Sequence, residues 1–187
     1  ASTHQSEEIF CAETHLLVKE KFNNILTIIV PRHIHRVKKI LNDLAKLKVN
    51  TVLYSKYEEL NNNTDVLLVD TYGELKKIYN ISKCVFLGKS LINSLAKDGG
   101  QNPIEASRLG CKIFHGPFVS NFAEIYKFLN TLNVTKEIKN PSELSQSLIK
   151  ELSEIAEKNK NAMQKIDEYG LDILNNVIKE IKIYINS

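Results

Sequence analysis

Short apolar runs rich in β-branched residues alternate with helix-length amphipathic segments along most of this chain. Residues 24–30 form the first such run, and Pro31 ends it. The following segment, residues 35–47, places apolar residues at helical spacing and lysines between them. This alternation predicts an α/β fold, a Rossmann-like open parallel sheet with helices on both faces.

The same patterns assign the rest of the chain. They predict strands over residues 51–54, 66–69, 83–87, 112–114 and 134–137. They predict helices over residues 73–79, 102–109, 121–129 and 141–159, and a last long helix that carries Leu171, Leu174, Ile178, Ile181 and Tyr184. Residues 1–4 resemble a loop that leaves a strand, so the sequence reads as if it begins inside a strand-helix unit.

The composition is that of an ordinary soluble globular protein. Of the 187 residues, 43% are hydrophobic and 25% are charged, and the apolar runs are too short to cross a bilayer. The net charge of +3, with lysines interspersed among acidic residues, argues against a nucleic-acid-binding face. Cys11, Cys84 and Cys111 are odd in number and lack CxxC spacing, which predicts buried thiols in a reducing, cytosolic compartment.

Three junctions between an apolar run and a helix share one design. They are residues 30–33, 70–75 and 99–105. In a parallel sheet such junctions lie together at the carboxyl edge of the strands, where ligands bind and where helix N-termini offer unpaired N–H groups to phosphates. We therefore expect this edge to bind a phosphate or a nucleotide.

A purely structural interpretation competes with this one. Residues 102–105 fit a capping box with proline at the first helical position, and Thr71 with Glu74 have the same spacing. Either motif alone is explained by capping at least as well as by binding. The carboxylates of Glu74 and Glu105 could instead accept hydrogen bonds from the hydroxyls of a ribose.

Capping does not account for the glycines. Gly73 is expected inside a first helical turn, where glycine is unfavourable, and residues 99–100 leave a bare backbone beside a helix start. Both arrangements permit the close approach of a ligand. Arg32 follows Pro31 at a strand end, and its planar guanidinium suits a phosphate or carboxylate, although a surface arginine is the commoner case.

Other chemistries find little support. His33 and His35 lie two residues apart with no carboxylate at a metal-ligand spacing, which argues against a zinc site. Ser90 and Ser94 lack the context of a nucleophile elbow. Residues 115–117 follow another strand end, and a plain turn is favoured there over a loop that lines a site. We expect no metal and no cofactor.

The chain carries five motifs, each present once: Ser2-Thr3-His4 with Glu7-Glu8, Val30-Pro31-Arg32-His33, Asp70-Thr71-x-Gly73-Glu74-Leu75, Gly99-Gly100-x-Asn102-Pro103-x-Glu105, and Gly116-Pro117 with Asn121-Phe122. In this order and spacing they resemble the C-terminal half of the bacterial 3-deoxy-D-manno-octulosonic acid (Kdo) transferases. The resemblance implies one half of a two-domain glycosyltransferase B fold. It implies that residues 1–187 are the single domain that binds the donor CMP-Kdo.

The resemblance also implies a set of site residues. The CMP site would be lined by Pro31, Arg32, Tyr72, Gly73, Glu74, Asn102, Pro103, Ile104 and Glu105. Arg32 would stabilise the phosphate of the departing CMP, while the catalytic base would belong to the N-terminal half. The chain departs from the family pattern at Gln101, where histidine is usual, at Tyr72, where methionine is common, and at Lys89, which interrupts a Gly-Gly-Ser. Lys89 and Gln101 are possible further contacts.

The implied function is metal-independent transfer of Kdo from CMP-Kdo to a lipid A precursor in lipopolysaccharide biosynthesis, at the cytoplasmic face of the bacterial inner membrane. Acceptor binding and peripheral membrane association would belong to the N-terminal half, so this chain alone is expected to be inactive. Two alternatives stay open. One is another sugar-nucleotide enzyme of the same fold, such as an epimerase or a different glycosyltransferase. The other is a nucleotide-binding module without catalysis.

Overall fold

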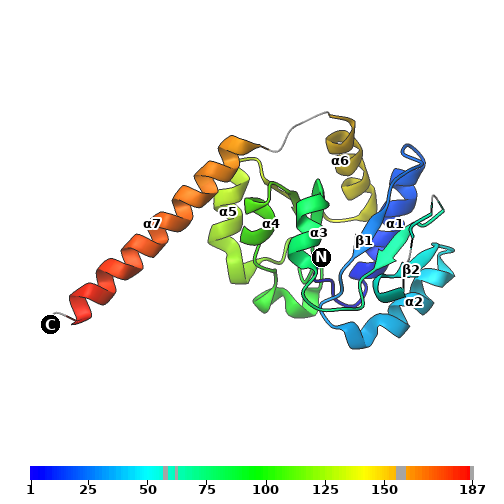
Figure 1. Cartoon of the computed structure of the whole chain (residues 1–187), viewed down its shortest axis with the longest axis horizontal. Helices are drawn as coiled ribbons and strands as arrows, with labels where there is room; N and C mark the ends of the chain where they lie inside the picture. Colours follow the sequence, from blue (N-terminus) through cyan, green and yellow to red (C-terminus); the bar gives the residue numbers. More distant parts are fainter. Residues whose placement is uncertain (57–58, 62, 155–158, 186–187) are drawn as a thin grey trace.

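A computed structural model describes residues 1–56, 59–61, 63–154 and 159–185, and it confirms the α/β class with parallel strands and helices on both faces (Figure 1). The elements in chain order are α1 (Glu7–Lys19), β1 (Thr27–Ile29), α2 (Val37–Lys46), β2 (Thr51–Leu53), β3 (Val66–Leu68), α3 (Leu75–Ile81), β4 (Cys84–Leu87), α4 (Ile104–Arg108), β5 (Lys112–His115), α5 (Ala123–Thr131), β6 (Thr135–Glu137), α6 (Pro141–Ser153) and α7 (Lys160–Ile185).

The strands form two parallel sheets of three strands each. Their orders are β1-β3-β2 and β4-β5-β6. In the first sheet Leu67 of β3 lies opposite Ile28 of β1, and in the second sheet Ile113 of β5 lies opposite Val85 of β4. The sheet that the sequence predicts as one is thus divided into two.

The N-terminal residues join the two sheets. Thr3 forms a parallel bridge with Pro31 after β1. Ala1 donates from its amino group to the carbonyl of Phe86 and accepts a hydrogen bond from the N–H of Gly88. Since these contacts align the two sheets, all six strands run in the same direction and their carboxyl ends lie on one edge.

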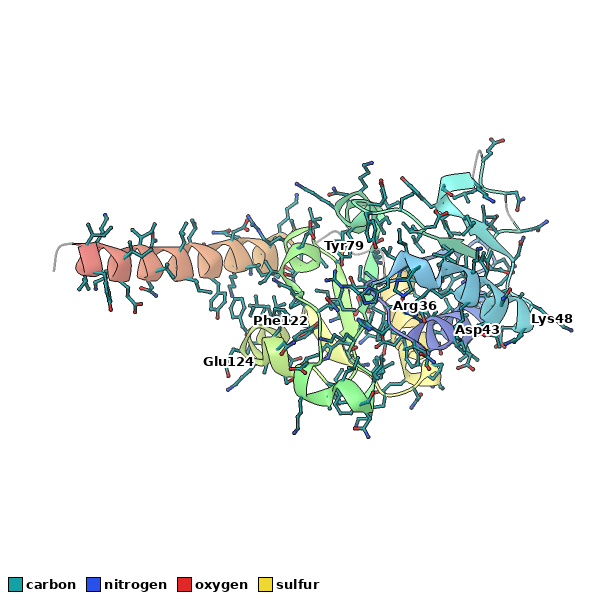
Figure 2. The ribbon with its side chains drawn as sticks, turned by 90° about the horizontal axis from the view of Figure 1, so that it is seen from below. Arg36, Asp43, Lys48, Tyr79, Phe122 and Glu124 are labelled. Atoms are coloured by element: carbon teal, nitrogen blue, oxygen red, sulfur yellow. The ribbon has the colours of Figure 1, made fainter. Side chains whose placement is uncertain are left out.

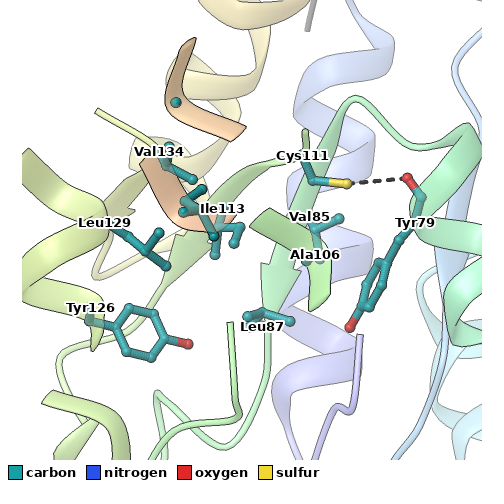
Figure 3. Packing of buried hydrophobic residues seen from close by; sticks show 11 residues of the cluster. Tyr79, Val85, Leu87, Ala106, Cys111, Ile113, Tyr126, Leu129 and Val134 are labelled. Carbon is teal, nitrogen blue, oxygen red and sulfur yellow. Dashed lines mark hydrogen bonds between the residues drawn. The ribbon is translucent and has the colours of Figure 1, made fainter. Parts of the chain in front are cut away.

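Each sheet buries a hydrophobic core of its own. Around the second sheet, Val85, Leu87 and Ile113 pack against helices α4, α5 and α7, and Figure 3 shows this cluster. Around the first sheet, residues of β1 and β3 pack against α1 and α2. In α2, Ile40 and Leu44 are buried as the apolar spacing predicts, because they lie on the same helix face.

Helix α1 is absent from the sequence-based assignment. Its buried face includes four polar residues, Glu7, Glu8, Thr14 and His15, so the apolar periodicity that reveals α2 is weak here. α1 packs against α6, which lies far along the chain, and against α2 and β1. Contacts with residues distant in the sequence therefore stabilise this helix.

The last long helix is confirmed, and most of its apolar side chains are exposed. Ala162 and Ile166 are buried, and the ring of Tyr169 stacks on Phe128 with centroids 4.2 Å apart. The C-terminal part of the helix leaves the body of the molecule (Figure 1), and Leu171, Leu174, Ile178 and Ile181 are all at least 40% exposed. The helix predicted over residues 141–159 ends at Ser153, and residues 155–158 lie outside the described residues.

None of the described helices is both long enough and apolar enough to span a membrane. The three cysteines are free thiols: Cys111 is buried, and Cys11 and Cys84 are half-buried. Burial raises the pKa of Cys11 and of Cys84 to about 12, so both thiols are protonated at neutral pH.

Candidate functional site

The predicted junctions lie at the shared carboxyl edge. Pro31 and Arg32 follow β1, residues 70–74 follow β3, and residues 99–105 lie between β4 and α4. Two of these segments are held to neighbouring loops through the main chain: the N–H of Arg32 donates to the carbonyl of Thr3 at 2.9 Å, and the N–H of Gly100 donates to the carbonyl of Lys89 at 2.7 Å. The topology therefore brings the three motifs to one edge, as the sequence predicts.

A cluster of basic side chains lies at this edge. The ring of His4 meets that of His33 edge to face, with centroids 5.7 Å apart, and His33 stacks on His35 at 5.5 Å. Burial lowers the pKa of His4, and the charges of His33, Lys89 and Arg36 act in the same direction. The sequence places His4 and His33 in motifs of the family resemblance but does not assign either to the site, because only the fold brings the loop over residues 1–6 next to the end of β1.

Three buried polar atoms in segments at this edge have no hydrogen-bond partner among the described residues. They are Thr3 Oγ1, His4 Nε2 and Thr71 Oγ1. A buried polar atom is destabilising unless a protein group, water or a ligand satisfies it. Their position points to a polar ligand at the carboxyl edge. No group of three His, Cys, Asp or Glu side chains that could hold a metal ion is found in the described part of the chain.

The two arginines near β1 differ in their surroundings. Arg36 forms two hydrogen bonds of 2.9 Å with the carboxylate of Glu8, and it lies near the middle of the molecule in Figure 2. Arg32 is exposed, and its guanidinium forms no ion pair within the described residues. Arg32 is thus available for a ligand, while Arg36 stabilises the fold.

The junction before α3 corrects one expectation. Gly73 precedes the helix, which begins at Leu75, and it adopts a φ of 88°. Glycine is therefore required by the backbone conformation rather than tolerated inside a helical turn. The hydroxyl of Thr71 does not cap the helix, so the capping box is absent here. Tyr72 is 71% exposed.

Glu74 has partners within the protein. Its carboxylate accepts a hydrogen bond from the hydroxyl of Tyr54 at 3.1 Å and forms an ion pair with Lys77 at 3.0 Å. The hydrogen bond from Lys77 lowers the pKa of Glu74 most, and the hydrogen bond from Tyr54 lowers it further. The carboxylate is ionised and held at the edge, where it can still accept from a ligand hydroxyl.

The junction before α4 forms only half of the predicted capping box. Asn102 accepts a hydrogen bond at its Oδ1 from the N–H of Ile104 at 3.0 Å, and Pro103 is buried. Glu105 is exposed, and its carboxylate has no hydrogen-bond or ion-pair partner among the described residues, so it does not complete the box. α3 has seven residues and α4 has five, so the dipoles at their N-termini are weak. The structure therefore gives little support to the expectation that helix N-termini hold the phosphate.

Close packing within the protein explains why glycine occupies positions 99 and 100, whereas the predicted close approach of a ligand does not. A Cβ on Gly99 would lie 2.5 Å from the carbonyl oxygen of Phe118, and one on Gly100 would lie 2.9 Å from Cα of Val119. The bare backbone predicted for a ligand is therefore covered by residues 118–119. The carbonyl of the next residue, Gln101, accepts a hydrogen bond from the hydroxyl of Tyr126 at 3.0 Å.

The turn over residues 115–117 also packs against the protein. The N–H of Gly116 donates to the buried hydroxyl of Ser90 at 2.9 Å, and the N–H of Phe118 donates to the carbonyl of Ser90 at 3.0 Å. Burial lowers the pKa of His115. This arrangement agrees with a plain turn and gives Ser90 a structural role.

Comparison with known proteins identifies relatives. No family model matches the chain. It is 30% identical over 174 residues to the 3-deoxy-D-manno-octulosonic acid transferase of Haemophilus influenzae, which covers 93% of this chain and 39% of that protein. It is 31% identical over 192 residues to a probable mitochondrial 3-deoxy-D-manno-octulosonic acid transferase of Arabidopsis thaliana, which covers 99% of this chain and 42% of that protein.

Among solved structures, the fold is similar to the C-terminal CMP-Kdo binding domain of WaaA from Acinetobacter baumannii, with a TM-score of 0.78 and 25% identity. The match covers 88% of this chain and 85% of that chain, and it confirms the expected glycosyltransferase B half. This chain spans about two fifths of the curated transferases that we compare it with. By sequence and by fold, the chain is related to the 3-deoxy-D-manno-octulosonic acid transferases and corresponds to their C-terminal domain.

Proposed function

We propose that this chain binds the nucleotide of CMP-Kdo at its carboxyl edge and acts, with a further domain, in the transfer of Kdo to a lipid A precursor. The observation that carries the proposal is the likeness to a CMP-Kdo binding domain over 88% of the chain. The edge supports it with an exposed arginine, an exposed glutamate and three unpartnered polar atoms. The predicted lining residues from Pro31 to Glu105 are the proposed contacts.

The chemistry assigned to this half is electrostatic. When an acceptor hydroxyl attacks the anomeric carbon of Kdo, the bond to the phosphate breaks and the phosphate of CMP gains negative charge. Arg32 lies at the edge with its guanidinium free to meet that charge, and Lys89 adds a second cation. Glu105 is available to accept from ribose hydroxyls. The base that deprotonates the acceptor, the acceptor site and the peripheral contact with the cytoplasmic face of the inner membrane belong, in this proposal, to the further domain.

A nucleotide titration of the isolated chain tests the donor site. We expect CMP to bind more tightly than UMP or UDP, because a CMP-Kdo site has to read the cytosine. Arg32→Ala should weaken CMP binding about tenfold, since a charge-assisted hydrogen bond contributes roughly 1.5 kcal/mol or more. Glu105→Gln should weaken it by a similar factor with the thermal stability unchanged, because the Glu105 carboxylate has no hydrogen-bond or ion-pair partner among the described residues.

Glu124→Gln is the matched control, since Glu124 is an exposed glutamate in the first turn of α5, as Glu105 is in that of α4. Its affinity for CMP should equal that of the wild type. Equal affinities for CMP and UDP would favour another sugar-nucleotide enzyme of this fold. Unchanged CMP affinity in both the Arg32 and Glu105 variants would contradict the assignment of the site.

Lys89 allows a separate prediction. Its backbone adopts a φ of 58°, in the left-handed region that disfavours a side chain by roughly 1 kcal/mol. We expect Lys89→Gly to raise the free energy of unfolding by about 1 kcal/mol and Lys89→Ala to leave it nearly unchanged. Both variants should bind CMP less tightly and with a weaker dependence on salt, because both remove the charge.

Denaturation in urea and CMP titrations across a salt series measure the two effects. A wild-type salt dependence in both variants would show that the Lys89 ammonium does not act on the phosphate. Equal stability of the glycine and alanine variants would contradict the conformational explanation. The positive φ also explains why the family pattern has a glycine at this position, and it leaves the lysine of this chain strained.

A further inference from the structure

The carboxyl edge carries one imidazole that the proposed nucleotide contacts do not use. Nε2 of His4 is buried and has no hydrogen-bond partner among the described residues, whereas the side chain as a whole is half-buried and lies at the surface of the edge. The ring meets that of His33 edge to face, with centroids 5.7 Å apart. An unpartnered buried nitrogen is destabilising, and a ligand that accepts from Nε2 offsets this cost.

The main chain places His4 beside Arg32. Thr3 forms a parallel bridge with Pro31, and the carbonyl of Thr3 accepts a hydrogen bond from the N–H of Arg32 at 2.9 Å. His4 and Arg32 are the next residues along these two paired segments, so their backbones are neighbours. The imidazole therefore lies next to the exposed arginine that is the proposed partner of the phosphate.

Glu7 holds the backbone of His4 next to that of Lys89. One carboxylate oxygen of Glu7, Oε2, accepts from the N–H of His4 at 2.9 Å and from the N–H of Lys89 at 2.8 Å. Since both N–H groups point at the same atom, the two residues are neighbours although they come from different loops. His4 is thus flanked by a residue with a cationic side chain on either side, Arg32 and Lys89.

The two acidic side chains near His4 already have partners. The carboxylate of Glu7 accepts from the main-chain N–H groups of residues 4, 89, 90 and 91. The carboxylate of Glu8 forms two hydrogen bonds of 2.9 Å with Arg36. Neither carboxylate accepts from the ring of His4. Donors and positive charges therefore surround the position next to Nε2, and such surroundings favour an anion.

The donor in the proposed function carries two anionic groups on one carbon. Kdo is an octulosonic acid, so its carboxylate is attached to the anomeric carbon, the same atom that carries the phosphate of CMP. A site that holds the phosphate at Arg32 therefore places the carboxylate directly beside it. Two negative charges this close repel each other, and a second donor next to Arg32 offsets the repulsion.

We propose that His4 binds the carboxylate of the sugar acid, with its Nε2–H donating to a carboxylate oxygen while Arg32 holds the phosphate. The inference rests on the proposed function, because it takes CMP-Kdo as the ligand of this edge. His33 is a positioning residue, since its ring meets that of His4 and fixes its orientation. A CMP ester of a sugar without a carboxylate would leave Nε2 unpartnered, so His4 selects for sugar acids.

Burial lowers the pKa of His4, and the positive charges of His33, Lys89 and Arg36 lower it further, while the charge of Glu7 acts in the opposite direction. The ring is therefore neutral at neutral pH, and the tautomer with its proton on Nε2 is a donor without being a cation. A neutral donor stabilises a carboxylate beside a guanidinium without adding repulsion between two cations in the free chain.

Titrations of the isolated chain with CMP and with CMP-Kdo separate the sugar subsite from the nucleotide site. His4→Phe keeps a flat ring against His33 and removes the donor. It should lower the affinity for CMP-Kdo about tenfold and leave the affinity for CMP unchanged. His4→Gln keeps an N–H donor and should lose only about threefold. The melting temperature of His4→Phe should equal or exceed that of the wild type, because an apolar ring edge replaces an unpartnered nitrogen.

Two further variants serve as controls. His35 is an exposed imidazole that stacks on His33 at 5.5 Å, and His35→Ala should bind both ligands as the wild type does. His4→Glu tests the charge of the ligand group, since a carboxylate at this position repels another carboxylate. Its affinity for CMP-Kdo relative to CMP should fall below that of His4→Phe. His4→Ala, which needs less space than phenylalanine, should show the same split between the ligands as His4→Phe.

The outcomes distinguish this inference from the proposed function. Equal losses of affinity for CMP and CMP-Kdo in His4→Phe would assign the ring to the phosphate, and unchanged affinities would show that it binds neither ligand. A relative affinity for CMP-Kdo in His4→Glu at or above that in His4→Phe would assign the ring to hydroxyls of the sugar. Each of these results would overturn the carboxylate subsite while CMP binding stands. A wild type that binds neither ligand would contradict the proposed function, and the inference with it.

Discussion

Glu7→Ala is expected to lower the free energy of unfolding by about 3 kcal/mol or more. The carboxylate is buried and accepts four main-chain hydrogen bonds: Oε2 from the N–H groups of His4 at 2.9 Å and Lys89 at 2.8 Å, and Oε1 from those of Ser90 at 3.0 Å and Leu91 at 3.1 Å. Alanine would leave these four donors without their acceptor. Each unsatisfied buried donor costs roughly 1 kcal/mol or more, and water reaches only some of them.

Glu7→Gln is a sharper test because it preserves the shape of the side chain. Each carboxylate oxygen accepts two N–H groups, so either orientation of the amide turns its NH₂ towards two donors. We expect this variant to be destabilised as well, by roughly 2 kcal/mol. Glu13→Gln on the exposed face of the same helix is the matched control and should behave as the wild type.

Guanidinium denaturation of the three variants measures these differences. Since Glu7 holds the loop that carries Lys89 next to His4, CMP binding should weaken in Glu7→Gln even where the protein remains folded. A Glu7→Gln variant as stable as the wild type would show that the carboxylate does not hold the two loops together.

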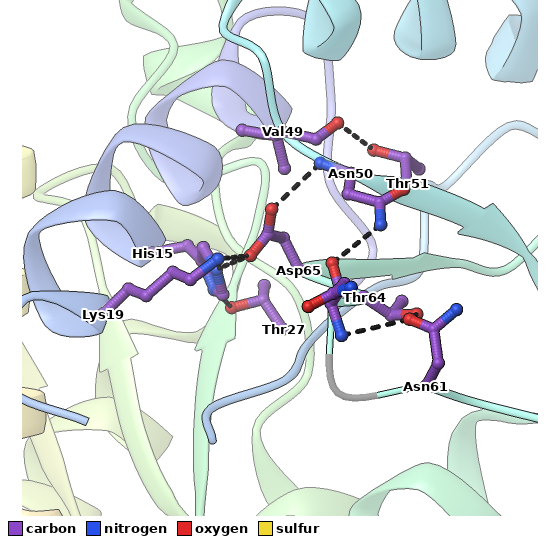
Figure 4. Close-up of polar contacts among 10 residues, drawn as sticks. His15, Lys19, Thr27, Val49, Asn50, Thr51, Asn61, Thr64 and Asp65 are labelled. Carbon is purple, nitrogen blue, oxygen red and sulfur yellow. Dashed lines mark hydrogen bonds and ion pairs between the residues drawn. The ribbon is translucent and has the colours of Figure 1, made fainter. Parts of the chain in front are cut away.

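Asp65→Ala is the second large effect, and we expect it to cost about 3 kcal/mol. Asp65 precedes β3 at the amino end of the sheet, and Figure 4 shows its partners. Its carboxylate accepts from the N–H of Asn50 at 2.9 Å and from Nε2 of His15 at 3.2 Å, and it forms an ion pair with Lys19. Alanine removes the acceptor for the fully buried His15 ring, whose Nδ1 is engaged with the hydroxyl of Thr27 at 2.9 Å.

Asp43→Ala is the control for this variant. Asp43 also pairs with two lysines, Lys39 and Lys46, but on the surface of α2, where such pairs contribute little to stability. Both lysine partners are exposed, and Figure 2 shows Asp43 on α2. Thermal denaturation should separate the two variants clearly. Equal destabilisation of both would contradict the distinction between a buried network and a surface pair.

The same network gives the chain an acid-dependent stability. Burial lowers the pKa of His15 below its ordinary value of 6.5. Burial acts to raise the pKa of Asp65, but hydrogen bonds from Lys19, Asn50 and His15 hold it below the ordinary value of 3.8. In both cases the unfolded chain takes up a proton first as the pH falls, so stability declines below about pH 6.5 and again below about pH 4. In Asp65→Asn the second decline should be shallower.

The sequence by itself predicted the elements whose own patterns are strong. The apolar run ending at Pro31 and the helical spacing of residues 35–47 appear in the structure as β1 and α2, because each buries a face that local periodicity marks. The motifs at the strand ends lie at one edge, since parallel strands place their carboxyl ends together. Arg32 and Glu105 are exposed there, as the binding interpretation requires.

Only the tertiary structure decided the rest, since contacts between residues distant in sequence determine it. Glu7 and His15 lie on the buried face of α1. Burying them is favourable only because the loop after β4 supplies hydrogen bonds to Glu7 and because Asp65 bonds to His15. No local pattern in the sequence therefore marks this helix. Gly99 packs against Phe118, a contact that no spacing reveals. The His4 cluster likewise arises from the way residues 3–4 meet the end of β1, because register and burial are properties of the assembled sheets.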